Sequence, residues 1–359
     1  MDPLVVAIDA RLAGKDFTGD STYWTGLLHG LSQVESDFRL LLFSNASKPE
    51  RIPDDPRFEW IALSSMSSRL WSLVRFPLVA RRRGARVLHT QYNVSFLAGP
   101  RAVTTVHDAS FFLEPSWFRP IDRVLLQRGV PSSVRRAAKV VTVSETSKRD
   151  IVRFMPEAAS KIAVTPLACN IEVSPMPREE ALKVVAEMRI EPPFLLAVGT
   201  RWPRKNLQLA FEAARLLPRT LPHSLVVAGK AGWGPEEIHE RIRLCGYVEG
   251  HQLNALYSTA DLLLVPSKYE GFGLTLLEGF ACGCPVVCSA GGSLPEVAGD
   301  AALVIDSWSA GDWAREIENL LGDSSKLAAM REAGRRREKS FSWKRTAELT
   351  LEAYKEAAR

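Results

Sequence analysis

Short apolar runs alternate with helix-length segments along the whole chain of 359 residues. Most of these runs are continuously apolar over three to five residues, a pattern typical of parallel strands buried on both faces. Strands that alternate with helices predict doubly wound parallel sheets, with helices on both faces of each sheet. The expected strands are 5–8, 40–43, 60–63, 87–89, 103–106, 140–143 and 162–164 in the first half of the chain, and 194–198, 225–228, 242–245, 262–265, 286–288 and 302–305 in the second.

Chain length and a local change of composition divide this α/β pattern into two domains. A chain of this length exceeds one ordinary domain and suits two, each large enough to bury its own core. We place the boundary near Ser174, because the segment 174–190 is rich in proline and charge, as linkers are. The expected domains are therefore 1–173 and 191–342. The last segment, 343–359, has apolar residues on one face of an amphipathic helix.

The composition is that of a soluble globular protein, with 46% hydrophobic and 24% charged residues. No apolar stretch approaches the roughly 18 residues that span a bilayer. Five cysteines make an odd set, which indicates reduced thiols in a cytoplasmic protein. Cys282, Cys284 and Cys288 form a cluster, but Cys288 falls inside an expected buried strand. We therefore interpret the cluster as core thiols and expect no metal.

The segment 270–278, EGFGLTLLE, carries the most specific chemistry of the chain, because it places two carboxylates around a glycine-rich turn after a buried strand. Gly271 and Gly273 allow the backbone to approach a ligand closely. A helix is expected from about Leu274, and its N-terminus favours a phosphate.

The two carboxylates of this segment have different expected partners. Glu278 lies about one turn into the helix, and its carboxylate can reach back to the start of the helix, where a ribose diol is a natural partner. Glu270 lies on the loop and can accept hydrogen bonds from sugar hydroxyls. Taken alone, two acids near a helix start are more often one stabilising and one surface glutamate.

The surrounding segments carry a family resemblance. They read FLLAVGTRWPRKN, SLVVAGK, GYVEGHQLNALYSTADLLLVPS, EGFGLTLLE, FACGCPVVCS and GGSLPEVAGDAALVID, and the first half adds IDARL, TTVHDASFF, VVTVSETSKRDI and VTPL. In this order the chain resembles, over nearly its whole length, the retaining glycosyltransferases of family four, also called group one. The resemblance implies the GT-B fold, with two Rossmann-like domains that face a central cleft and a terminal helix that packs back on the first domain.

The resemblance also implies a donor substrate, a nucleoside diphosphate sugar bound in that cleft at the carboxyl ends of the strands. Arg204 and Lys205 would face its diphosphate and stabilise the leaving group, although a Pro-Arg-Lys turn alone would be a solvated basic loop. His107 matches the histidine that contacts the donor sugar, where a lone histidine would otherwise be structural. Many members have Gly-Arg where this chain has Gly199 and Thr200, and Arg201 or Arg204 is left to supply that cation.

The roles that follow from the resemblance form two sets. The leaving phosphate takes the acceptor proton while the new bond forms on the same face of the sugar, so no carboxylate is the nucleophile and no metal or other cofactor is required. The expected catalytic residues are His107, Glu270, Lys205 and Arg204. The expected donor-binding residues are Thr200, Val248, Gly271, Phe272, Gly273, Leu274, Thr275 and Glu278, of which residues 272–275 bind phosphate through their backbone.

The first loop departs most from the family pattern. Members commonly have Gly-Ile-Gly-Arg-Tyr where this chain has Gly19, Asp20, Ser21, Thr22 and Tyr23. Asp20 places a negative charge near the expected diphosphate, which is unfavourable unless the side chain turns to the acceptor or to a cation. We assign Gly19, Asp20 and Ser21 to acceptor binding, with an equal alternative in which Ser21 or Asp20 simply caps a helix.

A net charge of +5 and a pI near 9.0 raise the question of anionic partners. The stripe 68–86 combines Trp71, Phe76 and Leu78 with arginines, as a lipid-binding helix does, but we favour packing of its apolar side on the sheet. Peripheral membrane contact stays open because the family's acceptors are often lipid-linked. Nucleic acid is not expected as a partner, because no nucleic-acid module is recognisable.

We therefore expect a retaining glycosyltransferase that moves a hexose, with mannose carried on GDP as the first choice, to a saccharide or a lipid-linked saccharide. The alternative is a catalytically silent relative that binds nucleotide or glycan as a subunit of a larger assembly. A third reading, an inverting enzyme of similar fold, would make His107 the catalytic base.

Overall fold

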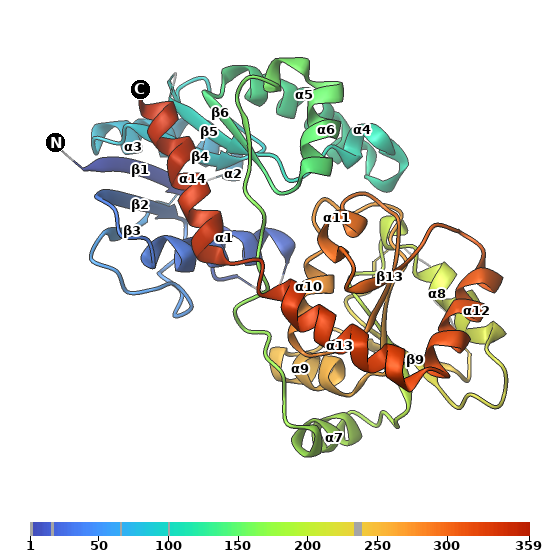
Figure 1. The fold of residues 1–359 in the computed structure, drawn as a ribbon. Coiled ribbons are helices and arrows are strands. Elements are labelled where there is room, and N and C mark those ends of the chain that lie inside the picture. The colour runs from blue at the N-terminus through green and yellow to red at the C-terminus, as the bar shows by residue number, and fades with distance from the viewer. Residues whose placement is uncertain (1–2, 16–17, 65–66, 100, 233–238) are drawn as a thin grey trace. The chain divides into compact units, whose positions relative to one another are not determined.

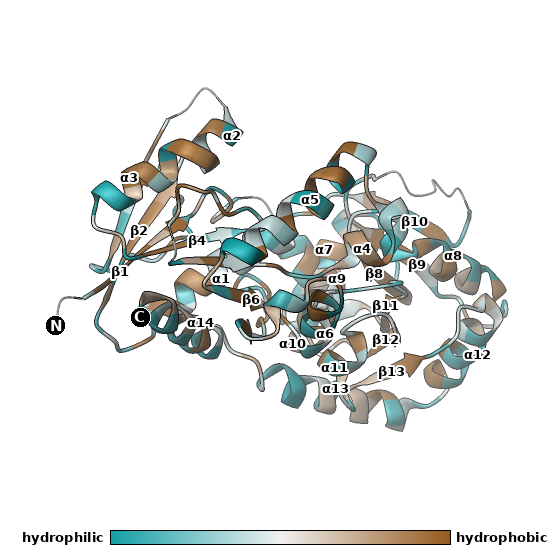
Figure 2. Cartoon of the chain, turned by 90° about the horizontal axis from the view of Figure 1, so that it is seen from above, coloured by the Kyte–Doolittle hydropathy of each residue, from teal (hydrophilic) through white to brown (hydrophobic). Residues whose placement is uncertain are grey.

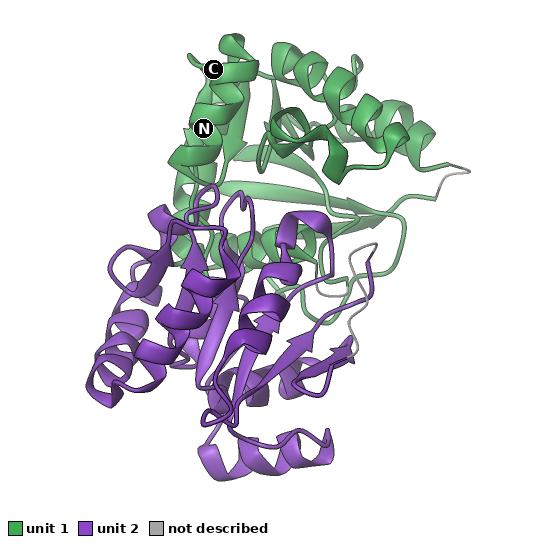
Figure 3. Cartoon of the chain, turned by 90° about the vertical axis from the view of Figure 1, so that its right-hand side faces the viewer, with its two compact units in different colours: residues 1–168, 342–359 green, residues 169–341 purple. Residues whose placement is uncertain are grey.

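The computed structural model describes residues 3–15, 18–64, 67–99, 101–232 and 239–359 (Figure 1). The chain forms two compact units, residues 1–168 with 342–359 and residues 169–341 (Figure 3). All the expected strands are present with bounds close to those predicted, and they form one sheet in each unit. Each unit is described by itself.

The first unit contains a seven-stranded sheet in the order β3-β2-β1-β4-β5-β6-β7, and all its neighbouring strands pair in parallel. Because β1 pairs with β2 on one side and β4 on the other, the strand order reverses between β1 and β4. Ligands of open α/β sheets bind outside the carboxyl ends of the strands at such a reversal. The strands are β1 (Leu4–Asp9), β2 (Phe38–Ser44), β3 (Phe58–Ala62), β4 (Val87–Gln91), β5 (Ala102–Thr105), β6 (Lys139–Thr142) and β7 (Ile162–Val164).

The helices of this unit include the C-terminal one. They are α1 (Gly19–Ser32), α2 (Ser68–Leu70), α3 (Phe76–Arg82), α4 (Ser110–Leu113), α5 (Pro120–Arg136), α6 (Glu145–Phe154) and α14 (Trp343–Ala358), with a π-helical turn at Trp71–Arg75 and 3₁₀ turns at Pro115–Trp117 and Pro156–Ala158.

Helix α14, red in Figure 1, packs against α1 through two glycines. A Cβ atom on Gly26 would lie 2.1 Å from the indole ring of Trp343, and one on Gly30 would lie 2.0 Å from the Trp343 carbonyl oxygen. Only glycine at both positions allows this close approach. The hydroxyl of Thr346 donates to the Pro166 carbonyl at 2.5 Å, which ties the start of α14 to the chain after β7.

The stripe 68–86 does not present its aromatic residues to solvent. Trp71 and Phe76 are each 1% exposed, and their rings stack with centroids 5.2 Å apart inside the core. The indole N–H of Trp71 donates to the Leu63 carbonyl at 2.7 Å. Trp71 and Phe76 therefore pack into the protein, as the favoured interpretation expected, and these two side chains are not available to a membrane.

The second unit contains a six-stranded parallel sheet in the order β10-β9-β8-β11-β12-β13, which reverses between β8 and β11. Its strands are β8 (Phe194–Val198), β9 (Ser224–Ala228), β10 (Ile242–Gly246), β11 (Leu262–Val265), β12 (Val286–Ser289) and β13 (Ala302–Ile305). Its helices are α7 (Arg178–Glu187), α8 (Leu207–Leu216), α9 (Gly250–Thr259), α10 (Leu274–Ala281), α11 (Leu294–Ala298), α12 (Ala310–Leu321) and α13 (Ser324–Glu338), with a 3₁₀ turn at Pro203–Lys205.

The linker is shorter than expected, because most of the segment 174–190 forms helix α7. Ala181 and Val185, one turn apart, are buried, and α7 packs against α9 within the second unit. The backbone N–H of Ser174 also donates to the side-chain oxygen of Asn254 on α9. Proline and charged residues in the sequence indicate that a linker joins the two units. They do not show that the charged segment forms a helix with a buried face.

Within the described residues, no helix is both long enough and apolar enough to cross a membrane.

Candidate functional site

The loop after β11 carries Glu270, whose carboxylate lies between two cations from the loop after β8. Arg204 donates to its Oε2 atom at 2.6 Å, and Lys205 donates to its Oε1 atom at 2.8 Å. The hydroxyl of Ser267 also donates to Oε1, at 2.6 Å. Burial of this 6% exposed residue would raise the pKa, but the two cations and the hydrogen bonds outweigh it and lower the pKa of Glu270 to about 2. The carboxylate is therefore ionised at neutral pH.

The main chain of Glu270 is held by the loop that precedes α11. Ser293 donates to the Glu270 carbonyl from its backbone N–H at 3.0 Å and from its hydroxyl at 2.9 Å. Arg204 donates a second hydrogen bond, to the Tyr269 carbonyl at 2.8 Å. These hydrogen bonds hold the main chain of Glu270 and the side chain of Arg204 in place. Glu270, Arg204 and Lys205 therefore form one preorganised group. Sequence analysis missed Ser267 and Ser293, since serines in loops carry no distinctive pattern.

Helix α10 begins at Leu274, as predicted, beside this cluster. Gly273 caps it with φ of +100°, and a Cβ atom there would lie 2.9 Å from the Leu294 side chain. Both the backbone angle and the space therefore require glycine. The first N–H groups of a helix lack partners within it, and Leu274 and Thr275 at this end are half-buried. The free N–H groups and the helix dipole favour an anion there.

Glu278, one turn into α10, is held by a tyrosine from α9. The hydroxyl of Tyr257 donates to Glu278 Oε2 at 2.8 Å, and among the described residues no donor reaches Oε1. Burial raises the pKa of Glu278, while the Tyr257 hydrogen bond and the charge of Lys205 oppose the rise. Tyr257 itself is fully buried. The sequence did not indicate that Tyr257 is the partner of Glu278, because a single tyrosine in an apolar stretch is typical of a buried core.

The remaining predicted donor residues lie in loops at the same edge of the sheet or at the start of α10. Thr200 follows β8 and Val248 follows β10, and both are half-buried. Gly271 and Phe272 are buried, and the Phe272 ring packs edge-on against Phe341 with centroids 5.6 Å apart.

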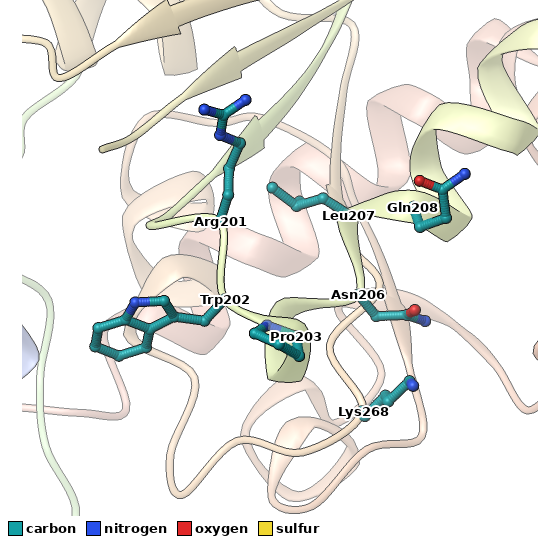
Figure 4. A pocket seen from close by; sticks show the side chains of 7 residues that line it. All are labelled: Arg201, Trp202, Pro203, Asn206, Leu207, Gln208 and Lys268. Carbon is teal, nitrogen blue, oxygen red and sulfur yellow. The ribbon is translucent and has the colours of Figure 1, made fainter. Parts of the chain in front are cut away.

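Arg201 and Arg204 occupy different places in the second unit. Arg204 lies at Glu270, whereas Arg201 is 8% exposed and lines a separate cavity of about 190 Å³. Figure 4 shows this cavity, which is lined by Arg201, Trp202, Pro203, Asn206, Leu207, Gln208 and Lys268. Of the two candidate cations, only Arg204 therefore joins Lys205 at the glutamate.

His107, in the first unit, follows β5 and packs among aromatic rings. Its ring meets Tyr23 edge-on at 4.9 Å and Tyr92 at 5.9 Å between centroids. Its Nε2 atom is buried, lies 3.6 Å from Asp20 Oδ1, and has no hydrogen-bond partner among the described residues. Burial lowers the pKa of His107, although the charges of Asp20 and Asp108 oppose the shift. The imidazole is therefore neutral at neutral pH.

A buried chain of hydrogen bonds runs from α14 to the residues around His107. Tyr354 lies 2.6 Å from His89 Nδ1, His89 Nε2 lies 2.8 Å from the Thr105 hydroxyl, and that hydroxyl lies 2.8 Å from the hydroxyl of Tyr23. Burial lowers the pKa of His89 to about 3, so its ring stays neutral. Because Tyr23 packs on His107, the C-terminal helix contributes to the position of that ring. Sequence analysis did not anticipate this chain.

The first loop contributes unequally to a cavity of about 350 Å³ beyond β1 and β4. Asp20 lines it, whereas Ser21 is 3% exposed and donates its hydroxyl to the Lys15 carbonyl at 2.7 Å. The predicted cap is wrong, because Thr18 accepts the Ser21 N–H and caps α1 from just before Gly19. The lining residues are Asp9, Arg11, Leu12, Lys15, Asp20, Trp24, Asn45, Ser68, Gln91 and Tyr92.

The clustered cysteines lie in the core of the second unit. Burial raises the pKa of Cys282 and of Cys288 to about 12, so both remain thiols at neutral pH. In the part of the chain that the structure describes, no group of three or more His, Cys, Asp or Glu residues is placed to hold a metal ion.

Two parallel α/β sheets with charged loops at their strand-order reversals agree with the GT-B fold. Models of two protein families match it: "Glycosyl transferases group 1" over residues 179–337 and "Glycosyltransferase Family 4" over residues 18–173. The chain belongs to the group 1 glycosyltransferases, as the motifs around Glu270 predicted.

One relative supports the family assignment, and two solved structures share the fold. The chain is 33% identical over 368 residues to O-antigen chain mannosyltransferase B of Escherichia coli, covering 94% of this chain and 96% of that protein. Sucrose-phosphate synthase of Thermosynechococcus elongatus has a similar fold, with a TM-score of 0.73, 19% identity and 98% coverage of both chains. The Anabaena protein HepE, solved with UDP and glucose, has a TM-score of 0.73, 16% identity and 98% coverage of both chains.

Proposed function

We propose that this protein transfers mannose from GDP-mannose, with retention of configuration, to a hydroxyl of a saccharide or lipid-linked saccharide during polysaccharide or glycolipid synthesis in the cytoplasm. The observation that carries the proposal is the Glu270, Arg204 and Lys205 cluster beside the start of α10. The choice of mannose is supported by the similarity to an O-antigen chain mannosyltransferase over 94% of this chain.

In this proposal the second unit binds the donor. Glu278 binds the ribose hydroxyls through the Oε1 atom that no described donor reaches, while Tyr257 fixes the other oxygen. The N–H groups of residues 273–275 and the cations of Arg204 and Lys205 bind the diphosphate. These cations replace a metal, because they stabilise the charge that develops on the leaving phosphate. Glu270 both orients the cations and accepts a hydrogen bond from the sugar.

The reaction breaks the bond between the anomeric carbon and the diphosphate oxygen, and forms a bond between that carbon and the acceptor oxygen on the same face. The acceptor proton passes to the departing diphosphate, so no side chain has to become a covalent intermediate. His107 is neutral, and its buried Nε2 atom without a protein partner among the described residues is suited to a hydrogen bond with the donor sugar. Asp20 lines the cavity in which we place the acceptor.

One observation favours a different mechanism, the inverting one. Asp20 lies 3.6 Å from His107, as an orienting carboxylate lies near a catalytic base. The distance is too long for a hydrogen bond, and burial lowers the pKa of His107, which weakens it as a base. Retention of configuration is therefore the better supported outcome. The other alternative, a catalytically silent relative, is tested by whether the protein turns over a donor at all.

The experiment is transfer from GDP-mannose to mannose-terminated oligosaccharides in the presence of EDTA, with the product anomer assigned by NMR. We expect an α-linked product, as in the donor, and loss of transfer in Glu278→Ala but not in Glu332→Ala, whose glutamate is 78% exposed on α13. A β-linked product would establish the inverting mechanism. Absence of transfer from GDP-, UDP-, ADP- and dTDP-sugars alike would favour the silent relative.

A further inference from the structure

The hydrogen-bond chain of Tyr354, His89, Thr105 and Tyr23 lies wholly inside the first unit, since all four residues are 0% exposed. Tyr354 belongs to the buried face of α14, a helix that carries both hydrophilic and hydrophobic residues (Figure 2). Burial of polar groups costs free energy unless they are paired, and apolar side chains of similar shape would avoid that cost. What the paired groups add is direction, because hydrogen bonds fix the positions of the side chains that they join.

Thr105, at the end of β5, is the member of this chain that is joined to both tyrosines around His107. Its hydroxyl lies 2.8 Å from the Tyr23 hydroxyl, and its main-chain carbonyl accepts the N–H of Tyr92 at 3.0 Å. The Tyr23 ring meets the His107 imidazole edge-on with centroids 4.9 Å apart, and the Tyr92 ring meets it at 5.9 Å. One residue thus anchors both rings that pack against the imidazole.

The Thr105 hydroxyl is itself held from its other side by His89. A neutral imidazole has one donor and one acceptor nitrogen. His89 therefore forms one hydrogen bond in each role, to Tyr354 through Nδ1 and to Thr105 through Nε2. The Thr105 hydroxyl lies between His89 and Tyr23, so it cannot turn without breaking a buried hydrogen bond.

The opposite face of the same two strands shows that buried threonines here need not be paired. Thr90 on β4 and Thr104 on β5 are opposite each other in the sheet, and both are buried. Their hydroxyls have no hydrogen-bond partner among the described residues. Neighbouring residues of a strand point to opposite faces, so Thr104 points away from Tyr23. It is a matched reference for Thr105.

We propose that Thr105 is a positioning residue for the transfer reaction and holds the His107 imidazole in the orientation that contacts the donor sugar. It acts through the rings of Tyr23 and Tyr92, while His89 holds its hydroxyl. The proposal rests on the proposed function, because it assumes that His107 contacts the donor sugar. It goes beyond that function, because turnover then depends on a buried hydroxyl that touches no substrate, and through His89 on the C-terminal helix.

The first test is steady-state transfer by threonine variants. Thr105→Val replaces the hydroxyl by a methyl group of similar shape and should lower kcat about tenfold through a misplaced imidazole. The affinity for GDP should not change, because we place the nucleotide in the second unit. Thr105→Ser keeps the hydroxyl and should restore most of the turnover, while Thr104→Val should behave as wild type. A loss that Thr105→Ser does not restore, or an equal loss in Thr104→Val, would overturn the proposal.

A double-mutant cycle with His107→Gln separates positioning from a merely structural role. If Thr105 acts through His107, Thr105→Val should lower kcat by less than about twofold in the His107→Gln background. A full tenfold loss in that background would mean that Thr105 supports the fold and not the imidazole. Tyr354→Phe, at the far end of the chain, should show the same dependence with a loss of about threefold. It serves as the second variant where Thr105→Val does not fold.

The imidazole signals of His107 in NMR spectra test the positioning without any turnover. They are assigned by their absence from His107→Gln, and the Tyr23 ring lies close enough to shift them. Thr105→Val and Tyr354→Phe should move these signals in the protein without donor, and Thr104→Val should not. Unmoved signals in Thr105→Val would overturn the proposal. Moved signals in a protein that transfers no sugar from any donor would refute the proposed function and leave the positioning of His107 in place.

Discussion

The two units place polar residues at the same edge of similar sheets, yet they satisfy them differently. In the second unit, the Glu270 carboxylate receives hydrogen bonds from Arg204, Lys205 and Ser267. In the first unit, the buried Nε2 atom of His107 has no hydrogen-bond partner among the described residues, and Asp20 lies 3.6 Å away. The Glu270 carboxylate is thus fully paired within the protein, and one net positive charge remains in its cluster, whereas the residues around His107 leave a buried polar atom without a partner among the described residues.

The proposed function gives this contrast a physical reason. A diphosphate carries charge, so cations that face it must be held in place without ligand, and a buried carboxylate does this at the cost of its own desolvation. A sugar is neutral and is recognised by hydrogen bonds, so a neutral imidazole is sufficient. We therefore expect substitutions in the second unit to change catalysis and stability strongly, and those around His107 to change pH dependence.

The largest expected effect is that of Lys205→Ala on catalysis. Loss of one cation at the leaving diphosphate should lower kcat/KM about 10³-fold, as for other groups that stabilise developing charge. Steady-state transfer assays measure it, with the exposed Lys326→Ala on α13 as the control. A fall of less than about tenfold would mean that the cluster is structural rather than catalytic.

Glu270→Gln should have the next largest effect, on stability. Two partly buried cations lose their counter-charge, which costs about 3 kcal/mol of unfolding free energy. The pKa of Glu270 is depressed to about 2, so its stabilisation is present above the ordinary glutamate pKa of 4.5 and is lost as the pH falls from 4.5 to about 2. Urea melts between pH 7 and pH 3 should therefore show a smaller acid-dependent loss in Glu270→Gln. An unchanged pH slope would contradict the ion-pair assignment.

Tyr257→Phe should have a smaller effect than the two preceding substitutions, and it tests the proposed donor site in the second unit. It removes the hydrogen bond to Glu278 Oε2 and should weaken nucleotide binding about fivefold, with little change in kcat. Tyr354→Phe removes a hydroxyl from the buried chain of the first unit and should leave nucleotide affinity unchanged. Calorimetric titration of GDP distinguishes them, and equal losses in both variants would show that the effect is not local to Glu278.

Asp20→Asn tests the first unit with the smallest expected effect. The Asp20 charge raises the pKa of His107 against the lowering caused by burial, so its removal should lower that pKa further. The acid limb of the pH profile of kcat/KM should move to lower pH, with the maximum rate little changed. A shift to higher pH would mean that Asp20 does not act on His107 through its charge.

Much of the fold, and the strand end, turn and helix start around residues 270–278, were predictable from local sequence. Buried parallel strands are continuous apolar runs, and the 270–278 motif joins strand end, turn and helix start in one short segment. Contacts distant in sequence were not predictable. Tyr354 and His89 are 265 residues apart, and nothing in either neighbourhood indicates the other.

The sequence also did not show which face of each helix is buried. The aromatic residues of the segment 68–86 are buried, while α5 exposes Ile121, Val124 and Leu125. Both segments mix apolar residues with arginines, so composition alone does not show which face the sheet covers. The charged segment that becomes α7 was treated as linker for a similar reason.

The most direct measurement of the central claim, that the second unit is a preformed and metal-independent donor site, is calorimetric titration of GDP, UDP, ADP and dTDP in EDTA. The account predicts binding of GDP without metal, lost in Glu278→Ala and greatly weakened in Lys205→Ala. Absence of binding by all four nucleotides, or binding that appears only when a divalent cation is added, would contradict it.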